Sequence, residues 1–145
     1  MTQLKETRIV ATPLEEAFDY TADFTNIENW DPGVARSVRT DSGPLRVGST
    51  FDLMVKFGSR QSPMTYTITH FEPPHRVVLE GEGSTLRAID EIGFRSVENG
   101  TEIGYTADLH FKGLMRFVAP FIGGALDKVG KKALDGLAAK LGQVA

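Results

Sequence analysis

The sequence contains no cysteine. Its 145 residues therefore cannot form a disulfide and offer no thiol nucleophile or thiolate metal ligand, which fits a reducing compartment. The net charge of −3 gives no basic surface that would attract nucleic acid. No apolar stretch reaches the ~18 residues of a membrane span, and the first residues lack the basic start and apolar run of a signal peptide. We therefore expect a cytoplasmic protein that neither spans a membrane nor binds nucleic acid.

Common catalytic motifs are missing too. The sequence has no G-x-S-x-G elbow, no Walker loop and no H-E-x-x-H pair of zinc ligands. Its three histidines, His70, His75 and His110, show no ligand spacing with one another or with a pair of carboxylates. The sequence therefore predicts no metal site and no cofactor.

The pattern of apolar residues predicts three successive regions in one domain, residues 1–145. A strand over 4–10 is followed by two short helices, the first of which begins at a capping box formed by Thr12 and Glu15. From 34 to 112 apolar and polar residues alternate with a period of two. This alternation is typical of antiparallel strands that have one apolar face and one solvated face.

The last region, 114–145, returns to helical spacing. Pro120 and the Gly123-Gly124 pair interrupt it and predict a kink or a short separate helix. Apolar residues recur along one side of this region, at the spacing that packs a helix against a sheet. The predicted stripe comprises Met115, Ile122, Leu126, Val129, Ala133, Leu137 and Leu141.

The Asn99-Gly100 pair predicts a hairpin between two of the strands. Asn-Gly favours a type I′ turn, because both central residues of that turn have positive φ. With these two residues as the loop, the flanking strands bring their apolar faces together, and Asp90 falls on that face. The predicted pairs are Phe94 with Tyr105, Ile92 with Ala107, and Asp90 with Leu109.

The order of these elements predicts an α+β protein with the helix-grip fold. In this fold a curved antiparallel sheet wraps around a long C-terminal helix, and two short helices follow the first strand. Four segments carry a more specific likeness: TPLEEAFDYTADFTNIENWDPGV, VGSTF, FEPPHRVVLEGEG and ENGTEIGYTADLHF. In them the chain resembles the polyketide cyclase/dehydratase-like branch of the START-like superfamily, also called SRPBCC or Bet v 1-like.

This resemblance implies a cavity between the sheet and the terminal helix. Members of the superfamily bind lipids, sterols, polyketides or other small hydrophobic molecules, and only some of them are enzymes. The family offers no shared catalytic motif that could be carried over to residues of this chain. The resemblance therefore implies a small hydrophobic or amphipathic ligand, lipid-, polyketide- or isoprenoid-like, and does not supply a reaction.

Two residues are candidates for acid–base catalysis. The predicted hairpin places the carboxyl group of Asp90 on the apolar face, where burial would raise its pKa and suit it to proton transfer. The alternative is a strand bend or bulge that turns Asp90 to solvent. His70 ends another inward face and could relay protons near neutral pH. The alternative for His70 is a position at the rim, hydrogen-bonded to backbone.

The candidate ligand-binding residues lie on the predicted inward faces. The Tyr66 and Tyr105 hydroxyls would need a hydrogen-bond partner there, either from a ligand or from the protein. Trp30 either stacks on a ligand or anchors the two short helices against the sheet. The full predicted set is Trp30, Tyr66, Ile68, Asp90, Ile92, Tyr105, Ala107, Met115, Ile122 and Leu126.

The segment 114–121 is apolar nearly all round, which is unusual for a surface helix. Leu114, Phe117 and Phe121 lie away from the main apolar stripe. They predict either a lid over the cavity mouth, hinged near Gly123, or a contact with a partner such as a second copy of the chain. The alternative is a locally thicker core.

Three functions fit these observations. The leading hypothesis is a binding or carrier protein for a small hydrophobic or amphipathic molecule, which a cavity lined only by carbon would favour. The second is a cyclase- or dehydratase-type enzyme that uses Asp90, His70 and the tyrosines for proton transfer. Clustering of Asp90 with a tyrosine or histidine in a cavity would favour this enzyme. The third is a regulatory interaction module, which a collapsed interior and an exposed patch at Leu114, Phe117 and Phe121 would favour.

Overall fold

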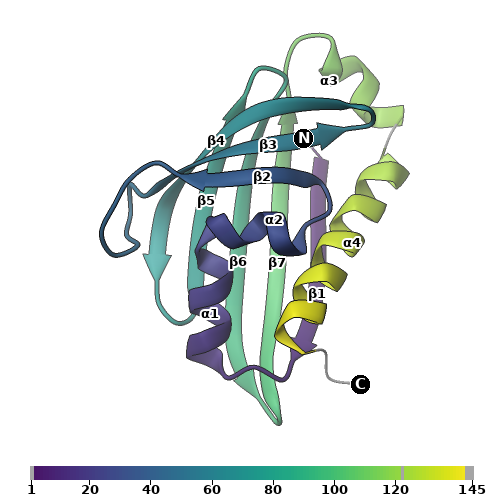
Figure 1. Ribbon diagram of the computed structural model, residues 1–145. Helices are drawn as coiled ribbons and strands as arrows, with labels where there is room; N and C mark the ends of the chain where they lie inside the picture. Colours follow the sequence, from purple (N-terminus) through teal and green to yellow (C-terminus); the bar gives the residue numbers. More distant parts are fainter. Residues whose placement is uncertain (1, 122, 143–145) are drawn as a thin grey trace.

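A computed structural model describes residues 2–121 and 123–142 of the chain (Figure 1). Seven antiparallel strands form one sheet, in the order β1-β7-β6-β5-β4-β3-β2. The strands are β1 (Thr2–Val10), β2 (Val34–Arg39), β3 (Thr50–Phe57), β4 (Arg60–Glu72), β5 (Arg76–Gly83), β6 (Leu86–Val97) and β7 (Gly100–Phe111).

The helices lie against one face of this curved sheet (Figure 1). The short helices α1 (Leu14–Ala22) and α2 (Ile27–Trp30) follow β1, with a 3-10 turn, η1 (Phe24–Asn26), between them. The long helix α4 (Gly123–Leu141) runs beside β1. One turn of helix, α3 (Met115–Val118), and a second 3-10 turn, η2 (Ala119–Phe121), connect β7 to α4. The α+β helix-grip architecture expected from the sequence is therefore confirmed.

The first helix begins differently from the prediction. Pro13 is the N-cap of α1, and no side chain makes a capping hydrogen bond there. The Thr12 hydroxyl instead donates a hydrogen bond of 2.6 Å to the carbonyl of Leu141, at the end of α4. The amide of Ala11 donates to the carbonyl of Gly142 in the same place. Thr12 therefore helps to hold the C-terminal end of α4 against the connection between β1 and α1.

The β6–β7 hairpin is shifted by two residues from the predicted register. Val97 pairs with Gly100, so the loop consists of Glu98 and Asn99. Asn99 has the left-handed backbone, with φ of 68°. Gly100 is needed for a different reason, because a Cβ there would overlap the carbonyl of Val10. The observed pairs are Phe94–Ile103, Ile92–Tyr105, Asp90–Ala107 and Ala88–Leu109.

A shift of two residues keeps every side chain on its predicted face, since side chains alternate with a period of two. Asp90 therefore still points to the concave, buried face and is 6% exposed. No bend turns it to solvent, because β6 and β7 pair without interruption from Leu86 to Val97.

Helix α4 packs closely only over its C-terminal half. Its buried residues are Ala133, Leu134, Leu137, Ala138 and Leu141. Val129 was predicted to be core but is 47% exposed, and Leu126 is only partly buried. Since the first half of the helix is less buried, the space between it and the sheet is not filled by α4 itself.

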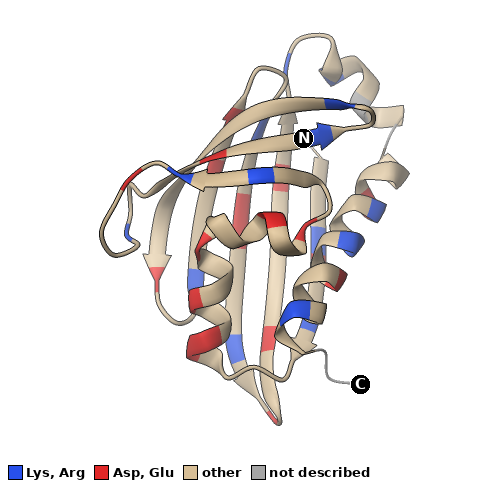
Figure 2. Cartoon of the chain, in the orientation of Figure 1, with Lys and Arg blue, Asp and Glu red and all other residues tan. Residues whose placement is uncertain are grey.

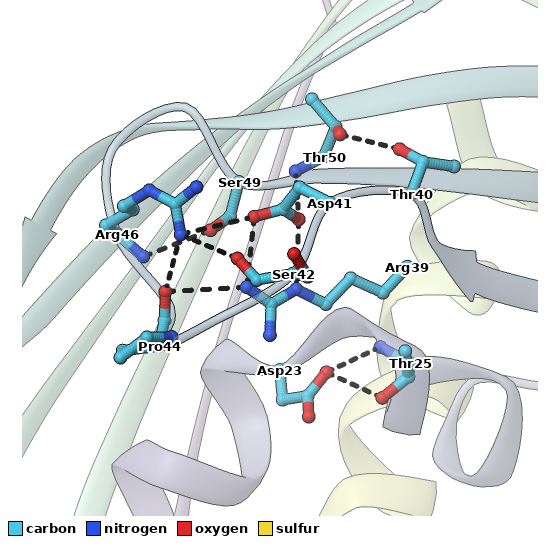
Figure 3. A network of polar contacts seen from close by, with 10 residues as sticks. All are labelled: Asp23, Thr25, Arg39, Thr40, Asp41, Ser42, Pro44, Arg46, Ser49 and Thr50. Carbon is cyan, nitrogen blue, oxygen red and sulfur yellow. Dashed lines mark hydrogen bonds and ion pairs between the residues drawn. The ribbon is translucent and has the colours of Figure 1, made fainter.

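The exterior carries many charged side chains. Figure 2 shows lysines along α4 and acidic residues on α1. Around Asp41, between β2 and β3, several polar groups converge (Figure 3). The guanidinium of Arg39 binds both carboxylate oxygens of Asp41 at 2.9 and 3.0 Å, and the amide of Thr50 donates to the same carboxylate at 3.1 Å. The hydrogen bond from Arg39 holds the pKa of Asp41 well below its usual range. This network fixes the loop that joins the two strands.

Candidate functional site

A cavity of about 190 Å³ lies between the sheet and helix α4. Its wall is mainly apolar and comes from strands β1, β2, β3, β4, β6 and β7, from α2 and its connection to β2, and from residues 126–134 of α4. The apolar lining includes Leu53, Met64, Leu86, Ala107, Leu109 and Leu126. This is the space left open where α4 stands away from the sheet.

A buried carboxyl–phenol pair lies in this cavity. The Tyr105 hydroxyl on β7 donates a hydrogen bond of 2.5 Å to Oδ2 of Asp90 on β6. Both residues line the cavity. Burial raises the pKa of Asp90 to about 7, opposed by the bond from Tyr105, while the nearby carboxyl groups of Asp31 and Asp108 raise it further. Asp90 can therefore gain and lose a proton near neutral pH.

A second carboxyl group, that of Asp31, also lines the cavity, and Asp31 was not one of the residues predicted from the sequence. It follows the last residue of α2, and its Oδ1 accepts a hydrogen bond of 2.8 Å from the amide of Gly33. Burial raises the pKa of Asp31 to about 6, against the opposing effects of this bond and of Lys56. The local sequence Asp31-Pro32-Gly33 indicates only a turn. No local signal places this residue near Asp90, because the two come together only through the fold.

Tyr66 is a further polar side chain in the cavity, whose lining also includes Lys5, Glu6 and Lys56. It lies on β4, is 7% exposed, and faces Gly81 on β5, where a Cβ would overlap its ring. Burial and the nearby carboxyl groups of Asp90 and Asp31 hold its pKa well above that of a free tyrosine. The pKa of Tyr105 is raised in the same way, chiefly by burial. Both phenols therefore remain neutral hydrogen-bond donors at neutral pH.

Several predicted site residues lie elsewhere. Ile68 and Ile92 are buried on the concave face but do not line the cavity, and neither does Trp30. Phe18 of α1 packs against Phe71 and Phe94 at ring-centroid distances of 5.6 and 5.2 Å, so α1 fills its part of the concave face with core.

Trp30 anchors α2 against the sheet, which was the alternative to stacking on a ligand. Its ring meets the ring of Tyr105 edge-on at 6.2 Å, and it lies in the core rather than at the cavity surface. Met115 of α3 is not a lining residue. Ile122 lies outside the described residues. Tyr66, Asp90, Tyr105, Ala107 and Leu126 are the predicted residues that the structure brings together at the cavity.

His70 is exposed, contrary to its predicted inward position. The β4–β5 register shifts between Ile68 and His70, so the alternation of side chains breaks there. Ile68 faces the core, and Phe71 takes the next inward position and packs on Phe18. The bulge therefore removes His70 from the candidate acid–base residues.

The connection between β7 and α4 exposes large apolar side chains. Leu114 is 83% exposed, Phe117 is 62% exposed and Phe121 is 87% exposed, and none of the three lines the cavity. A homodimer through this patch stays a prediction, which sedimentation of the protein with Phe117→Ser and Phe121→Ser would test.

Neither a cluster of metal-ligating side chains nor a membrane-spanning helix is found in residues 2–121 and 123–142. In this part of the chain no group of three or more His, Asp or Glu side chains is placed to hold a metal ion. No helix in the same described part is long and apolar enough to cross a membrane.

The fold has many relatives among solved structures. A protein from Thermus thermophilus matches with a TM-score of 0.81 and 12% identity over 96% of each chain. An aromatase/cyclase from a Streptomyces species matches with a TM-score of 0.78 and 12% identity, over 96% of this chain and 92% of that one. A START superfamily protein from Mycobacterium smegmatis matches with a TM-score of 0.77 and 13% identity over 97% of each chain. At such identities the likeness shows the fold alone.

Sequence comparison gives the family. No curated protein sequence matches the chain. The family model described as polyketide cyclase / dehydrase and lipid transport matches residues 1–142, nearly the whole chain. The chain therefore belongs to the polyketide cyclase/dehydrase and lipid transport family.

Proposed function

We propose that the protein binds a small, mainly apolar molecule in the cavity and exchanges a proton with it through Asp90. The observation that supports this most is the hydrogen bond from Tyr105 to a buried carboxyl group in a mainly apolar cavity. A cavity for simple carriage needs no such titratable group. The proposed class is thus an acid–base enzyme of the cyclase or dehydratase type.

The geometry suggests a role for each group. Asp90, with a pKa of about 7, takes a proton from an acidic C–H or O–H group of the ligand, or gives one to a departing hydroxyl. In a dehydration, one C–H bond and one C–O bond break, a C=C bond forms and water leaves. Tyr105 orients the Asp90 carboxyl group, and Tyr66 is free to donate to a ligand carbonyl. The family, described as polyketide cyclase / dehydrase and lipid transport, supports chemistry of this class.

A second candidate function is carriage without reaction. Its support is the apolar wall of the cavity, with the carboxyl groups serving only to recognise a polar end of the ligand. The volume of about 190 Å³ favours a compact molecule of one or two rings. An engineered apolar cavity of ~150 Å³ holds benzene, whereas pockets for larger ligands span roughly 300–1,000 Å³.

One compound tests both functions. β-Tetralone is a neutral two-ring ketone whose α-hydrogens exchange with solvent when a base removes them. We expect calorimetry to detect its binding, and NMR in deuterium oxide to detect faster α-exchange with the wild type than with Asp90→Asn. Asp52→Asn, on the exposed face of β3, is the matched control. If β-tetralone binds but its α-hydrogens exchange equally fast with the wild type and with Asp90→Asn, only the carrier function remains. If β-tetralone does not bind, the enzyme and carrier functions are both refuted.

A further inference from the structure

Acidic and phenolic groups predominate among the polar side chains of the cavity, whose lining also includes two exposed lysines, Lys5 and Lys56. Asp31 and Asp90 are carboxyl groups, Tyr66 and Tyr105 are phenols, and Glu6 on β1 also lines the space. Glu6 already has a cation, since Arg8 lies 3.2 Å from its carboxylate. Among the described residues no Lys, Arg or His side chain forms an ion pair with Asp31 or Asp90. The interior therefore holds two carboxyl groups that lack a counter-ion in contact.

Such a pair is costly to bury, because a desolvated carboxylate needs a cation or several hydrogen-bond donors. Asp31 receives one backbone hydrogen bond, at Oδ1, and no bond to its Oδ2 is found in the described part of the chain. Lys56 is exposed, and it affects Asp31 only through space. Burial raises the pKa of Asp31, and the bond from Gly33 and the charge of Lys56 offset this effect only in part.

Tyr66 gives an independent indication that the cavity receives a polar ligand group. Its side chain is 93% buried and lines the cavity, yet no hydrogen bond from or to its hydroxyl is found among the described residues. The hydroxyl oxygen is not one of the fully buried unpaired atoms of the described residues, so a ligand or water in the cavity can reach it and supply the partner. The phenol oxygen accepts hydrogen bonds, and an aromatic face attracts cations.

We propose that the cavity recognises a protonated amine on a compact one- or two-ring framework, with Asp31 as its counter-ion and the Tyr66 hydroxyl as a further acceptor. The apolar wall formed by Leu53, Met64 and Leu109 then surrounds the rings. Asp90 stays available for proton exchange in the same ligand. This inference rests on the proposed function, binding of a small molecule in the cavity, and specifies in addition that the ligand is positively charged.

The same arrangement disfavours anions. A carboxylate or phosphate ester beside Asp31 and Asp90 would meet two acidic groups, whereas the lysines of the lining, Lys5 and Lys56, are exposed to solvent. Like charges in a low-dielectric space repel strongly. Fatty acids and other anionic amphiphiles are therefore poor ligands of this cavity.

Three isosteric probes test the proposal: naphthylmethylamine, naphthylmethanol and naphthoate. By calorimetry at pH 7.5 we expect the amine to bind at least tenfold more tightly than the alcohol, and naphthoate to bind most weakly. Asp31→Asn should reduce the affinity for the amine to that for the alcohol and leave the alcohol unaffected. Asp52→Asn, which removes a charge from the outer face, should keep the amine preference.

A second measurement uses the unmodified protein, in case Asp31→Asn does not fold. The preference for the amine should fall as the pH is lowered from 7.5 to 5, because Asp31 gains a proton in that range. The other titratable groups that line the cavity with Asp31 are Asp90, Tyr66, Tyr105, Glu6, Lys5 and Lys56, and the tyrosines stay neutral throughout.

Each result decides a different statement. Equal binding of amine and alcohol would overturn the inference and leave the proposed binding function intact. An amine preference that survives Asp31→Asn but disappears in Asp90→Asn would overturn the assignment of Asp31. A preference that does not change with pH would also overturn it. If none of the three probes binds, both the inference and the proposed function fail.

Discussion

At Gly136 helix α4 lies directly against the backbone carbonyl of Trp30, so closely that a Cβ would overlap the oxygen. This contact fixes where the terminal helix crosses the end of α2. Residues on both sides of it, Leu134 and Leu137, are buried, whereas Val129 toward the other end of the helix is 47% exposed. The close approach at one end and the separation at the other leave the cavity between them.

The first prediction concerns this contact. Gly136→Ala should destabilise the protein by about 1–3 kcal/mol, because the added methyl group forces α4 away from Trp30. Gly130→Ala is the matched control in the same helix, where a Cβ would meet Leu4 at an ordinary 3.7 Å. There the gain in helix propensity should stabilise by up to about 1 kcal/mol. Urea unfolding of both variants measures the difference, and equal effects would show that the Gly136 contact is not limiting.

The second prediction concerns the β6–β7 hairpin. Gly100→Ala should destabilise the fold because its methyl group collides with the carbonyl of Val10. Asn99→Gly should be tolerated, since Asn99 is the residue with positive φ and glycine adopts that conformation readily. Thermal unfolding of the two variants checks this order. If Asn99→Gly were the more harmful change, the close approach of Gly100 to β1 would not be the controlling feature.

The third prediction is a pH dependence of stability. In an unfolded chain the pKa of an aspartate is about 3.9, and folding raises the pKa of Asp90 to about 7. The folded state therefore holds this proton more tightly than the unfolded chain does. The stability contributed by protonated Asp90 is complete below about pH 4 and is lost as the pH rises toward 7.

Asp90→Asn should remove this loss. Above pH 7 the variant should be more stable than the wild type, by up to about 4 kcal/mol if the whole shift acts on folding. Near pH 4 the two should have similar free energies of unfolding. Denaturant unfolding across this range is the measurement, with Asp52→Asn on the exposed face as control. If the difference in free energy of unfolding between the wild type and Asp90→Asn does not change between pH 4 and 7, the prediction that Asp90 is buried and ionisable is contradicted.

The fourth prediction concerns the space itself. Ala107 is a small residue that lines the cavity and pairs with Asp90 across the two strands. Ala107→Trp should fill the cavity and abolish binding of β-tetralone while the protein keeps its fold. Calorimetry and thermal melts, run side by side, give both readouts. Undiminished binding, or the collapse expected of an overpacked core, would show that Ala107 does not face an open space.

Much of the fold could be predicted because alternating strands and an amphipathic helix leave strong local patterns. The register of the β6–β7 hairpin could not, because the contact of Gly100 with Val10 involves a strand about ninety residues earlier. The prediction that Asp90 is buried is nevertheless confirmed, because a register shift of two residues leaves each side chain on the same face of the sheet.

The candidate site was predicted only in part, for equally physical reasons. His70 is exposed because a bulge interrupts the alternation of β4, and a single sequence gives no clear sign of that bulge. Asp31 sits in a turn whose local chemistry explains it fully, and only tertiary structure brings it to the cavity. Val129 fits the helical period, but it is exposed because the first half of α4 stands away from the sheet.

The pairing of the first strand with the last has a consequence for how the chain folds. β1 joins the sheet only beside β7, and the amide of Ala11 bonds to the carbonyl of Gly142. Contacts between such distant segments require large loops to close, which slows folding. During synthesis β1 can pair only after β7 has been made. Until β1 has paired, the exposed edge of β7 can pair with other chains. Aggregation of the newly made protein should therefore compete with the late docking of β1 and α4.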